Sequence, residues 1–364
     1  MLSTVLITGG AGFIGSHLAD TLLARGYKVR VLDNLTPEVH GNAARRPERL
    51  SDEVELMIGD IRNQQDVRRA LKDVDIVFHL AARMGTGQHT YEQAQYTSVN
   101  NTGTAVLLQQ LIHGGVQKLV VASSMSVYGE GLYKDVHGQL VENVNRSVEQ
   151  LQQKSWNPVD LEGRPLLACP TSELKQARIH SAYALSKAAQ ERMCLLAGEA
   201  YGIPVVALRF FNVYGMHQMF SNQYTGALTI FAWRLLNDRA PLLFEDGLQQ
   251  RDFVHVKDAV AACCNAMDMI DSGCSVYNIG SGQSTTYHDV ATMLARITGR
   301  EHIRPEISGK YREGDIRHCF ADISKAWKEL RYRPQVFPDQ GLAEITGWLK
   351  EQSTADRFIR FGQN

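Results

Sequence analysis

A tyrosine and a lysine four residues apart form the most informative chemical pair in the sequence. Tyr183 and Lys187 stand in the stretch YALSK, and on a helix positions i and i+4 lie on one face. Free tyrosine has a pKa near 10, so ionising it near neutral pH needs a downward shift of roughly three units, or about 4 kcal/mol. A neighbouring ammonium supplies part of that stabilisation. The pair therefore predicts a phenol that acts as a base, and the alternative is a surface helix with a cation near a ring.

A glycine-rich stretch near the N-terminus could hold a dinucleotide. In TGGAGFIG, residues Gly9, Gly12 and Gly15 lie between a predicted strand and a predicted helix. Glycines there permit a tight turn and a close approach of the backbone to a pyrophosphate, which the helix N-terminus stabilises. The spacing differs from the commoner Gly-X-Gly-X-X-Gly, and an ordinary tight turn also uses glycine.

Polar and small residues follow the next predicted strands. Asp33 ends the second strand, where a carboxylate accepts hydrogen bonds from ribose hydroxyls and repels a 2'-phosphate, so NAD is favoured over NADP. The alternative is that Asp33 begins a turn with Asn34. Asp60 could similarly meet the adenine edge, and the small residues of Leu80-Ala81-Ala82 leave room for the cofactor.

Three serines follow the fifth predicted strand, in the stretch ASSMSVYG. In open α/β sheets ligands lie beyond the carboxyl ends of the strands, so Ser123, Ser124 and Ser126 are expected to face a cleft. A serine-rich turn with no role in binding is the alternative.

The elements that must position these residues alternate between strands and helices. Strands are predicted at 4–8, 28–32, 54–58, 75–80, 118–122, 204–210 and 276–279, and helices at 12–25, 64–71, 93–113, 183–201, 225–237, 256–270, 287–298 and 338–350. This alternation predicts a doubly wound parallel α/β sheet with helices on both faces. Residues 130–178 show no clear periodicity, and long stretches of that kind are usually functional or flexible.

Composition limits the partners. The chain has 364 residues, 44% hydrophobic and 21% charged, with 38 Lys and Arg against 39 Asp and Glu, giving a net charge of -1. We therefore expect no recruitment of nucleic acid or of an anionic membrane. No apolar run approaches a membrane span and no signal peptide is recognised, so we expect a cytoplasmic protein. The six cysteines show no Cys-X-X-Cys spacing, so neither a metal site nor a disulfide framework is expected.

Taken together, the motifs resemble the extended short-chain dehydrogenase/reductase family, in particular its NAD-dependent nucleotide-sugar epimerases. The resemblance extends from Thr4 to Trp348 and is carried by the glycine triplet, Asp33, Asp60, Asn100, SSXXVYG, YXXXK, RFFN at 209–212 and RDFVHV at 251–256. It implies a Rossmann-type doubly wound sheet with a smaller C-terminal α/β substrate-binding domain. The expected NAD-binding domain comprises 1–211 and about 254–280, with an insertion at about 130–178, and the nucleotide-sugar-binding domain comprises 212–253 and 281–364. Relatives usually dimerise through two helices from each subunit, here 93–113 and 181–201.

The resemblance also assigns roles. It makes Tyr183 the general base, Lys187 the residue that holds the nicotinamide ribose and lowers the Tyr183 pKa, and Ser124 the partner of the reacting sugar hydroxyl. The residues implied for binding NAD are Gly9, Gly12, Phe13, Ile14, Gly15, Asp33, Asn34, Asp60, Ile61, Leu80, Ala81, Ala82, Asn100, Ala122, Ser123, Tyr183, Lys187 and Phe210. Those implied for the substrate are Arg83, Ser124, Ser126, Asn212, Phe244, Arg251, Arg312 and Asp315.

The implied reaction is epimerisation at carbon 4 of a nucleotide-activated sugar or deoxysugar through a transient 4-keto intermediate. Family members that dehydrate the sugar carry Asp-Glu directly after the catalytic hydroxyl residue. At these positions this chain has Met125 and Ser126, and neither side chain is a general acid near neutral pH. The sequence therefore argues against a nucleotide-sugar 4,6-dehydratase. A net nucleotide-sugar dehydrogenase or 4-ketoreductase, and a non-catalytic dinucleotide sensor, remain alternatives.

The insertion bears on the sugar. Together with SNQYTG at 221–226 and LFEDG at 243–247, it resembles the group of dTDP-L-rhamnose 4-epimerases, so a dTDP- or UDP-linked sugar is expected. Relatives in that group carry paired cysteines in the insertion, and this chain keeps only Cys169, so no metal is expected.

Overall fold

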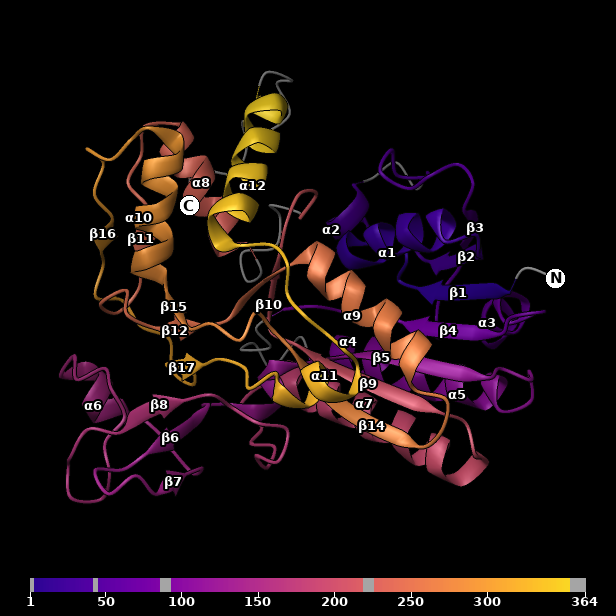
Figure 1. Cartoon of the computed structure of the whole chain (residues 1–364), viewed down its shortest axis with the longest axis horizontal. Coiled ribbons are helices and arrows are strands. Elements are labelled where there is room, and N and C mark those ends of the chain that lie inside the picture. Colours follow the sequence, from indigo (N-terminus) through magenta and orange to yellow (C-terminus); the bar gives the residue numbers. More distant parts are fainter. Residues whose placement is uncertain (1–2, 42–44, 86–92, 219–225, 354–364) are drawn as a thin grey trace.

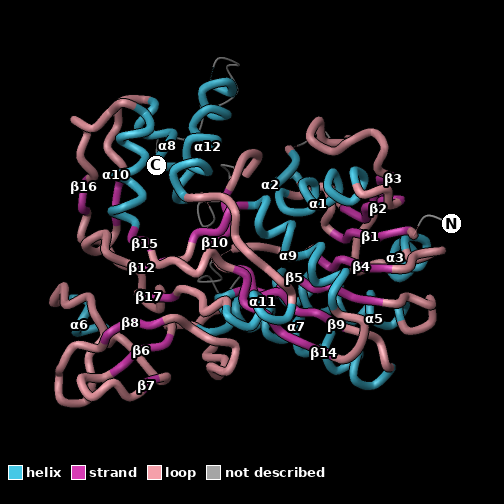
Figure 2. The backbone as a smooth tube through the Cα atoms, viewed as in Figure 1, coloured by secondary structure: helices cyan, strands magenta, loops and turns pink. Residues whose placement is uncertain are grey.

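A single parallel sheet organises the N-terminal two thirds of the chain (Figures 1 and 2). The computed structural model describes residues 3–41, 45–85, 93–218 and 226–353. Seven parallel strands lie in the order β14-β9-β5-β4-β1-β2-β3. Their bounds are β1 Thr4–Thr8, β2 Lys28–Asp33, β3 Glu55–Ile58, β4 Ile76–His79, β5 Lys118–Ser124, β9 Val205–Phe210 and β14 Cys274–Ile279. The doubly wound α/β sheet predicted from the sequence is confirmed.

Helices cover both faces of this sheet because its strands are apolar on both sides. Val120 of β5 packs in one core with helices α1 (Phe13–Ala24) and α9 (Val256–Met269). Its neighbours Leu119 and Val121 pack in another core with α3 (Gln64–Ala70), α5 (Gly103–Leu111) and α7 (Ala182–Tyr201). Successive residues of the strand thus pack into opposite cores, because side chains along a strand alternate between the two faces of the sheet.

The strand order reverses between β1 and β4. From β1 the chain proceeds to β2 and β3 on one side, and the later strands β4, β5 and β9 continue on the other. In open α/β sheets a ligand binds in the crevice outside the carboxyl ends of the strands at such a reversal. The glycine loop follows β1, so it lies at this point.

A smaller region closes over the carboxyl edge of the sheet (Figure 1). Helices α8 (Ala227–Leu236), α10 (Tyr287–Thr298) and α12 (Pro338–Ser353) share a separate apolar core. Three small sheets accompany them: β10-β13 (Asn212–Tyr214 and Phe253–His255), β11-β16 (Leu242–Leu243 and Glu306–Ile307) and β15-β12-β17 (Thr285–Thr286, Gln250–Arg251 and His318–Cys319). The short helix α11 (Ser324–Glu329) precedes the return to α12.

The insertion is folded. It contains β6 (Leu132–Lys134), β7 (Leu140–Val141), the helix α6 (Val148–Gln152) and β8 (Leu167–Cys169), with antiparallel order β7-β6-β8. The amide of Gly131 donates to the carbonyl of His318, and that of Thr171 to the carbonyl of Phe320, so the insertion is joined to the chain around β17. The strands have only two or three residues, too few for periodicity to show in the sequence.

Two predicted helices differ in detail. The predicted helix 93–113 is divided into α4 (Gln93–Tyr96), a π-helix at Thr97–Thr102 and α5, because Asn100 in the π-helical turn bonds outward to Ser186. The predicted helix 225–237 begins at Ala227. Residues 221–225 of the SNQYTG motif lie outside the described residues.

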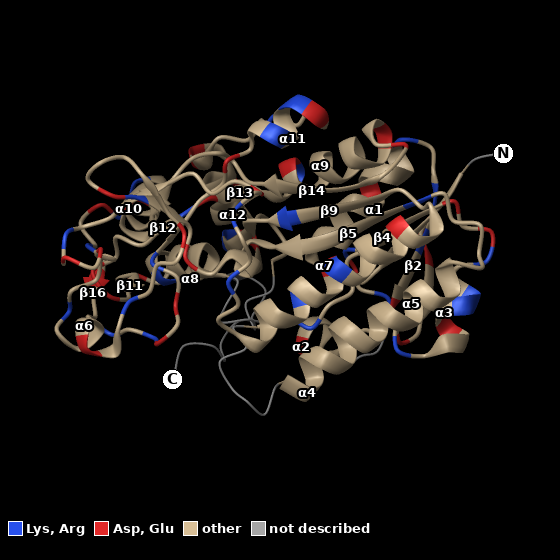
Figure 3. Cartoon of the chain, turned by 90° about the horizontal axis from the view of Figure 1, so that it is seen from below, with Lys and Arg blue, Asp and Glu red and all other residues tan. Residues whose placement is uncertain are grey.

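In the view of Figure 3, lysine and arginine residues are interspersed with aspartate and glutamate residues over the chain. Within the described ranges, no helix is both long enough and apolar enough to cross a membrane.

Candidate active site

A cavity of about 1230 Å³ opens beyond the carboxyl ends of the sheet and is lined by both regions of the chain. Of the predicted residues, it brings together Gly9, Gly12, Phe13, Ile14, Gly15, Asp33, Asn34, Ile61, Leu80, Ala81, Ala82, Arg83, Ala122, Ser123, Ser124, Ser126, Tyr183, Lys187, Phe210, Asn212, Phe244, Arg251, Arg312 and Asp315. Two predicted residues, Asp60 and Asn100, do not line it.

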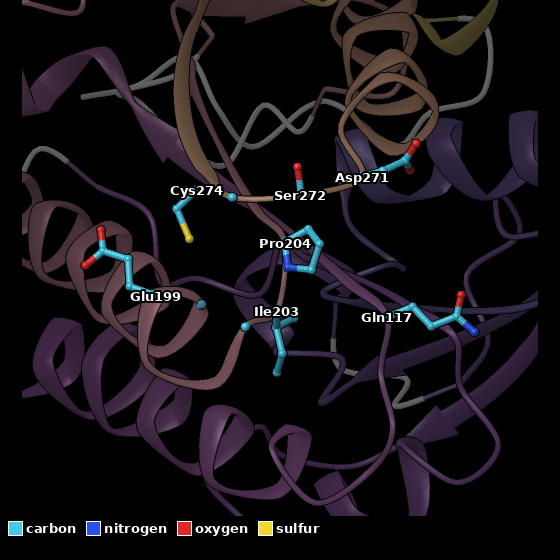
Figure 4. Close-up of a pocket in the computed structure, with 10 residues that line it drawn as sticks. Gln117, Glu199, Ile203, Pro204, Asp271, Ser272 and Cys274 are labelled. Carbon is cyan, nitrogen blue, oxygen red and sulfur yellow. The ribbon is translucent and has the colours of Figure 1, made fainter.

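A second hollow lies at the opposite edge of the sheet (Figure 4). It holds about 370 Å³ and is lined by residues that precede β5, β9 and β14, such as Gln117, Pro204 and Gly273. Its described lining has two acidic residues, Glu199 and Asp271, and no Lys, Arg or His. It therefore suits an anionic cofactor poorly, and the larger cavity is the candidate active site.

The glycine loop has the shape of a pyrophosphate cradle. Gly9 has φ +70° and lies so close to the backbone of Ala81 that an added Cβ would come within 2.7 Å of its Cα. A Cβ on Gly15 would meet the Cα of Gly10 at 2.6 Å. Gly12 caps α1, and the first turn of a helix leaves its amide groups without intrahelical partners. The residues present therefore fit a dinucleotide phosphate group at the N-terminus of α1.

Asp33 lies at the expected strand end and is held by backbone amides. Its carboxylate accepts from the amide of Ala11 at 3.1 Å and of Leu35 at 3.0 Å, and His40 lies 3.7 Å away. Burial raises the pKa of Asp33, and the hydrogen bond from Leu35 opposes the rise. The carboxylate is thus fixed at the cavity wall, next to Asn34, where a ribose would be bound.

Asp60 and Asn100 have other partners. Asp60 receives two hydrogen bonds from the guanidinium of Arg62, which lowers its pKa to about 2. Its neighbours Ile61 and Arg62 line the cavity instead. Asn100 is fully buried and bonds both backbone groups of Arg83, at 2.7 Å and 3.1 Å. Neither side chain lines the cavity, because their polar atoms hold adjacent segments, and their contact with the cofactor stays a prediction.

Tyr183 stands in the first turn of α7, whose N-cap Ser181 accepts from the amide of Ala184. The phenol of Tyr183 faces the side chain of Ser124, the residue that ends β5. Burial raises the pKa of Tyr183 to about 12, and the hydroxyl of Ser124 opposes the rise. Two groups predicted from separate motifs therefore meet at one point of the cavity.

The side chain of Lys187 is held by partners other than the phenol of Tyr183, and its effect on the Tyr183 pKa stays a prediction. Its ammonium donates to the carbonyl of Ala122 and, at 2.5 Å, to the side chain of Gln190. Burial lowers the pKa of Lys187 itself to about 8. The side chain of Gln190 in turn is hydrogen-bonded with His79 at 2.9 Å. Burial lowers the pKa of His79 to about 3, so its imidazole is neutral. The lysine is therefore held against β5 by partners that the spacing of YXXXK does not reveal.

The far end of the cavity is cationic. Arg251 is 5% exposed, donates to the carbonyl of Ile316 at 2.5 Å and lies over the ring of Tyr287 at 5.6 Å. Arg312 lies over the ring of Phe244 at 5.0 Å. A planar guanidinium binds phosphate oxygens in pairs, so this end suits a diphosphate.

Several buried polar atoms of the cavity wall have no hydrogen-bond partner within the described part of the chain. They include Oγ of Ser126 and Oδ1 of Asn212, both predicted for substrate binding, and Oε1 of Gln249. Buried polar atoms are normally satisfied, so acceptors left open along a cavity fit a ligand with hydroxyl or amide donors.

Some lining residues were not predicted. One of them is Glu38, which lines the cavity although no sequence motif marks it. Glu38 forms an ion pair at 3.2 Å with Arg83, a residue predicted to bind the substrate. Tyr287 and Gln249 likewise come to the cavity only through the fold. Arg234 of α8 also lines the cavity, and no sequence motif marks it.

Comparison with known proteins agrees with these features. The model of the NAD dependent epimerase/dehydratase family matches residues 5–147 and 163–280. The chain is 34% identical to the dTDP-L-rhamnose 4-epimerase of Burkholderia thailandensis over 353 residues, which cover 96% of this chain and 95% of that protein.

Solved structures give the same result. The UDP-glucose 4-epimerase of Thermotoga maritima with UDP-glucose has a TM-score of 0.78 and 30% identity, covering 96% of this chain and 99% of that one. The UDP-glucose 4-epimerase of Thermus thermophilus in complex with NAD has a TM-score of 0.76 and 30% identity, covering 95% and 99%. The similarity includes the sheet and the region that closes over it, and the chain therefore belongs to the NAD dependent epimerase/dehydratase family, as its motifs predicted.

Proposed function

We propose that the protein epimerises carbon 4 of a nucleotide-activated sugar, using NAD bound in the cavity. The observation that carries this proposal is the pairing of Tyr183 with Ser124 in a cavity that the glycine cradle and the arginines also line. A reacting sugar carbon at this pair would have a dinucleotide on one side and a diphosphate anchor on the other.

The roles follow from the contacts. The glycine loop, Asp33, Ala122 and Lys187 hold NAD, which when bound supplies reversible hydride acceptance. Ser124 orients the sugar 4-hydroxyl and ionised Tyr183 removes its proton, while the hydride on carbon 4 would pass to the bound NAD, so that a 4-keto sugar is left. Arg251 and Arg312 retain the diphosphate while the sugar turns and is reduced on its other face.

Epimerisation is favoured over net redox chemistry by the placement of the groups. The cavity spans both ligand ends, so cofactor and nucleotide anchor can stay bound through a full cycle. The relative in Burkholderia and both solved neighbours are named 4-epimerases. If the protein is instead a net dehydrogenase or 4-ketoreductase, each sugar molecule converted consumes one molecule of cofactor.

The experiment is to purify the protein and supply dTDP- and UDP-sugars without added cofactor, resolving products by NMR. A 4-epimer that accumulates to equilibrium with no net change in the absorbance of the reduced cofactor supports the proposal. Products that form only in proportion to added NAD(H) would assign the protein to the oxidoreductase alternative.

For the substrate, we propose a dTDP-linked 6-deoxysugar of the L-rhamnose type, with UDP-hexoses as the competing class. The support is the Burkholderia relative, 34% identical over nearly the whole of both chains, together with the insertion motifs. The same panel of sugars tests this substrate. A kcat/KM that is higher for a UDP-sugar than for the dTDP-sugar would overturn the proposed substrate.

For the organisation of the chain, we propose that 1–211 with about 254–280 bind NAD and that 212–253 with 281–364 bind the nucleotide sugar. The packing supports this division, because β14 and α9 belong to the sheet layer while α8, α10 and α12 share their own core.

A further inference from the structure

The buried side chain of Arg146 joins the insertion to the substrate end of the cavity. This residue lies between β7 and α6 and its side chain is 3% exposed. Its guanidinium donates to Oε1 of Glu245 at 2.7 Å, to the backbone carbonyl of Asp315 at 2.8 Å and to that of Trp156 at 3.3 Å. One planar group thus joins the insertion to two distant segments of the chain.

Those two segments carry the cationic end of the site. Glu245 directly follows Phe244, and Asp315 belongs to the same turn as Arg312. The two segments meet where Arg312 lies over the Phe244 ring. Arg146 does not line the cavity, so it acts on this place only through its acceptors.

The turn at Glu245 needs such support. Glu245 has φ +52°, a left-handed backbone conformation that a residue with a side chain adopts at a cost in free energy. Its amide donates to the carbonyl of Lys310 at 2.8 Å, and its carboxylate is shared between Arg146 and Arg317. Both carboxylate oxygens are therefore bonded, and the turn is fixed by its side chain.

Arg317 completes the cluster from the other side. Its side chain is fully buried, bonds Glu245 at 2.8 Å, and forms a bidentate pair with Asp246 at 2.7 Å and 2.8 Å. Its Nε donates to Oδ1 of Asn157 at 3.0 Å, and its backbone amide donates to Glu130 at 2.6 Å. Figure 1 shows the insertion strands β6, β7 and β8 beneath β12 and β17.

We propose that Arg146 is a positioning residue for the nucleotide part of the substrate, and that the insertion acts through it to set the geometry of the Phe244 and Arg312 turns. This inference rests on the proposed function in taking a nucleotide diphosphate as the ligand. Removing one member of a buried charged network leaves its partners unsatisfied, so the two turns relax. Tyr183 and Ser124 belong to the sheet layer, so the chemical step itself is unaffected once substrate is bound.

The proposal predicts a specific kinetic signature. Arg146→Met weakens binding of UDP or dTDP and raises KM by about tenfold or more, since small misplacements at a binding site have effects of that order. The value of kcat stays within about threefold of the wild type, and the NAD content of the purified enzyme is unchanged. Arg146→Lys, which keeps the charge but loses the planar fork, shows a partial effect.

Arg164→Met is the matched control. Arg164 is also in the insertion, yet it is paired only with Asp160 and Glu162 of its own turn and its side chain is 42% exposed. We expect it to bind both diphosphates as the wild type does. Glu245→Gln adds a double-mutant cycle, in which its effect and that of Arg146→Met combine less than additively.

The measurements are calorimetric titration of the NAD-loaded enzyme with UDP and with dTDP, steady-state kinetics and thermal unfolding. Arg146→Met that binds both diphosphates as tightly as wild type overturns the inference. Equal losses in kcat, NAD content and diphosphate binding also overturn it, because they indicate general disorder. If Arg146→Met does not fold, Arg146→Lys and Glu245→Gln decide by the same criteria. A wild type that binds neither diphosphate overturns the proposed function itself, which separates the two failures.

Discussion

The chemistry proposed here depends on how two side chains of α7 are held. Tyr183 faces Ser124, and burial raises the pKa of Tyr183 to about 12, so the phenol is neutral near pH 7. Lys187 is held by Ala122 and Gln190 rather than by the phenol. The ionised base required for turnover therefore depends on positive charge brought to the phenol in the loaded site, and Lys187, four residues further along the same helix, is the cation that we propose supplies it.

The first prediction is a pH dependence. A base with a raised pKa is mostly protonated at neutral pH, so kcat/KM rises with pH through the pKa of the loaded Tyr183. Removing the ammonium with Lys187→Met raises that pKa further, and the rising limb of the profile moves to higher pH while kcat falls about a hundredfold. Lys257→Met, at an exposed lysine paired with Glu344, is the control that leaves the profile in place. An unmoved limb in Lys187→Met would refute the proposed role.

At the scale of elements, the junction of β1 and α1 is a tightly packed part of the cofactor site. Alanine in a helix interior is normally favoured over glycine by about 1 kcal/mol. At Gly15 the added Cβ would instead lie 2.7 Å from the carbonyl oxygen of Gly9. The loop must open to admit it, and the helix N-terminus then moves away from its pyrophosphate.

We therefore predict that Gly15→Ala is destabilising and lowers affinity for NAD by about tenfold or more. Gly347→Ala is the matched control, since Gly347 also lies within a helix, α12, and an added Cβ would meet nothing within 4 Å. This control should raise the melting temperature slightly. Thermal unfolding and NAD titration check both variants, and equal behaviour of the two would contradict the account of the loop.

The elements themselves were largely predictable from the sequence, whereas their cross-links were not. Helix α10, predicted at 287–298, has those bounds, because a capping box at Thr286 and Asp289 starts it and Gly299 ends it. Such signals are local in the sequence. The contacts of Arg146 with Glu245 and of Glu130 with Arg317 join residues 99 and 187 apart, and no short-range pattern reports them.

The same distinction explains the candidate site. Glycines, Asp33 and the serines follow predicted strands, so parallel topology alone gathers them at one edge. Asp60 and Asn100 also belong to motifs, yet their side chains bond Arg62 and the backbone of Arg83 instead of lining the cavity. A motif gives the position of a residue along the fold, and only packing decides which way its polar atoms point.

At the scale of the whole molecule, α7 presents apolar side chains to solvent. Leu185 is 59% exposed and Leu196 is 46% exposed, and a separation of 11 residues places them on one face of the helix. Helix α5 packs beside α7 on the same face of the sheet. We propose that these helices form a homodimer interface.

The prediction is that Leu185→Glu combined with Leu196→Glu converts a dimer to a monomer in light scattering, because each charge would lie in the apolar centre of the interface. Leu161→Glu, at a fully exposed leucine of the insertion, is the control and leaves the mass unchanged. A wild-type protein that is monomeric at working concentrations would contradict the interface.

The central claim is that one bound NAD oxidises and then reduces the same carbon, with Tyr183 as the base. The most direct test is conversion of a dTDP- or UDP-sugar carrying deuterium at carbon 4, followed by NMR. The account predicts the 4-epimer with deuterium retained at carbon 4, and a loss of about a hundredfold or more in turnover with Tyr183→Phe, which keeps the fold. Deuterium lost to solvent or to added cofactor, or near-normal turnover in Tyr183→Phe, would contradict it.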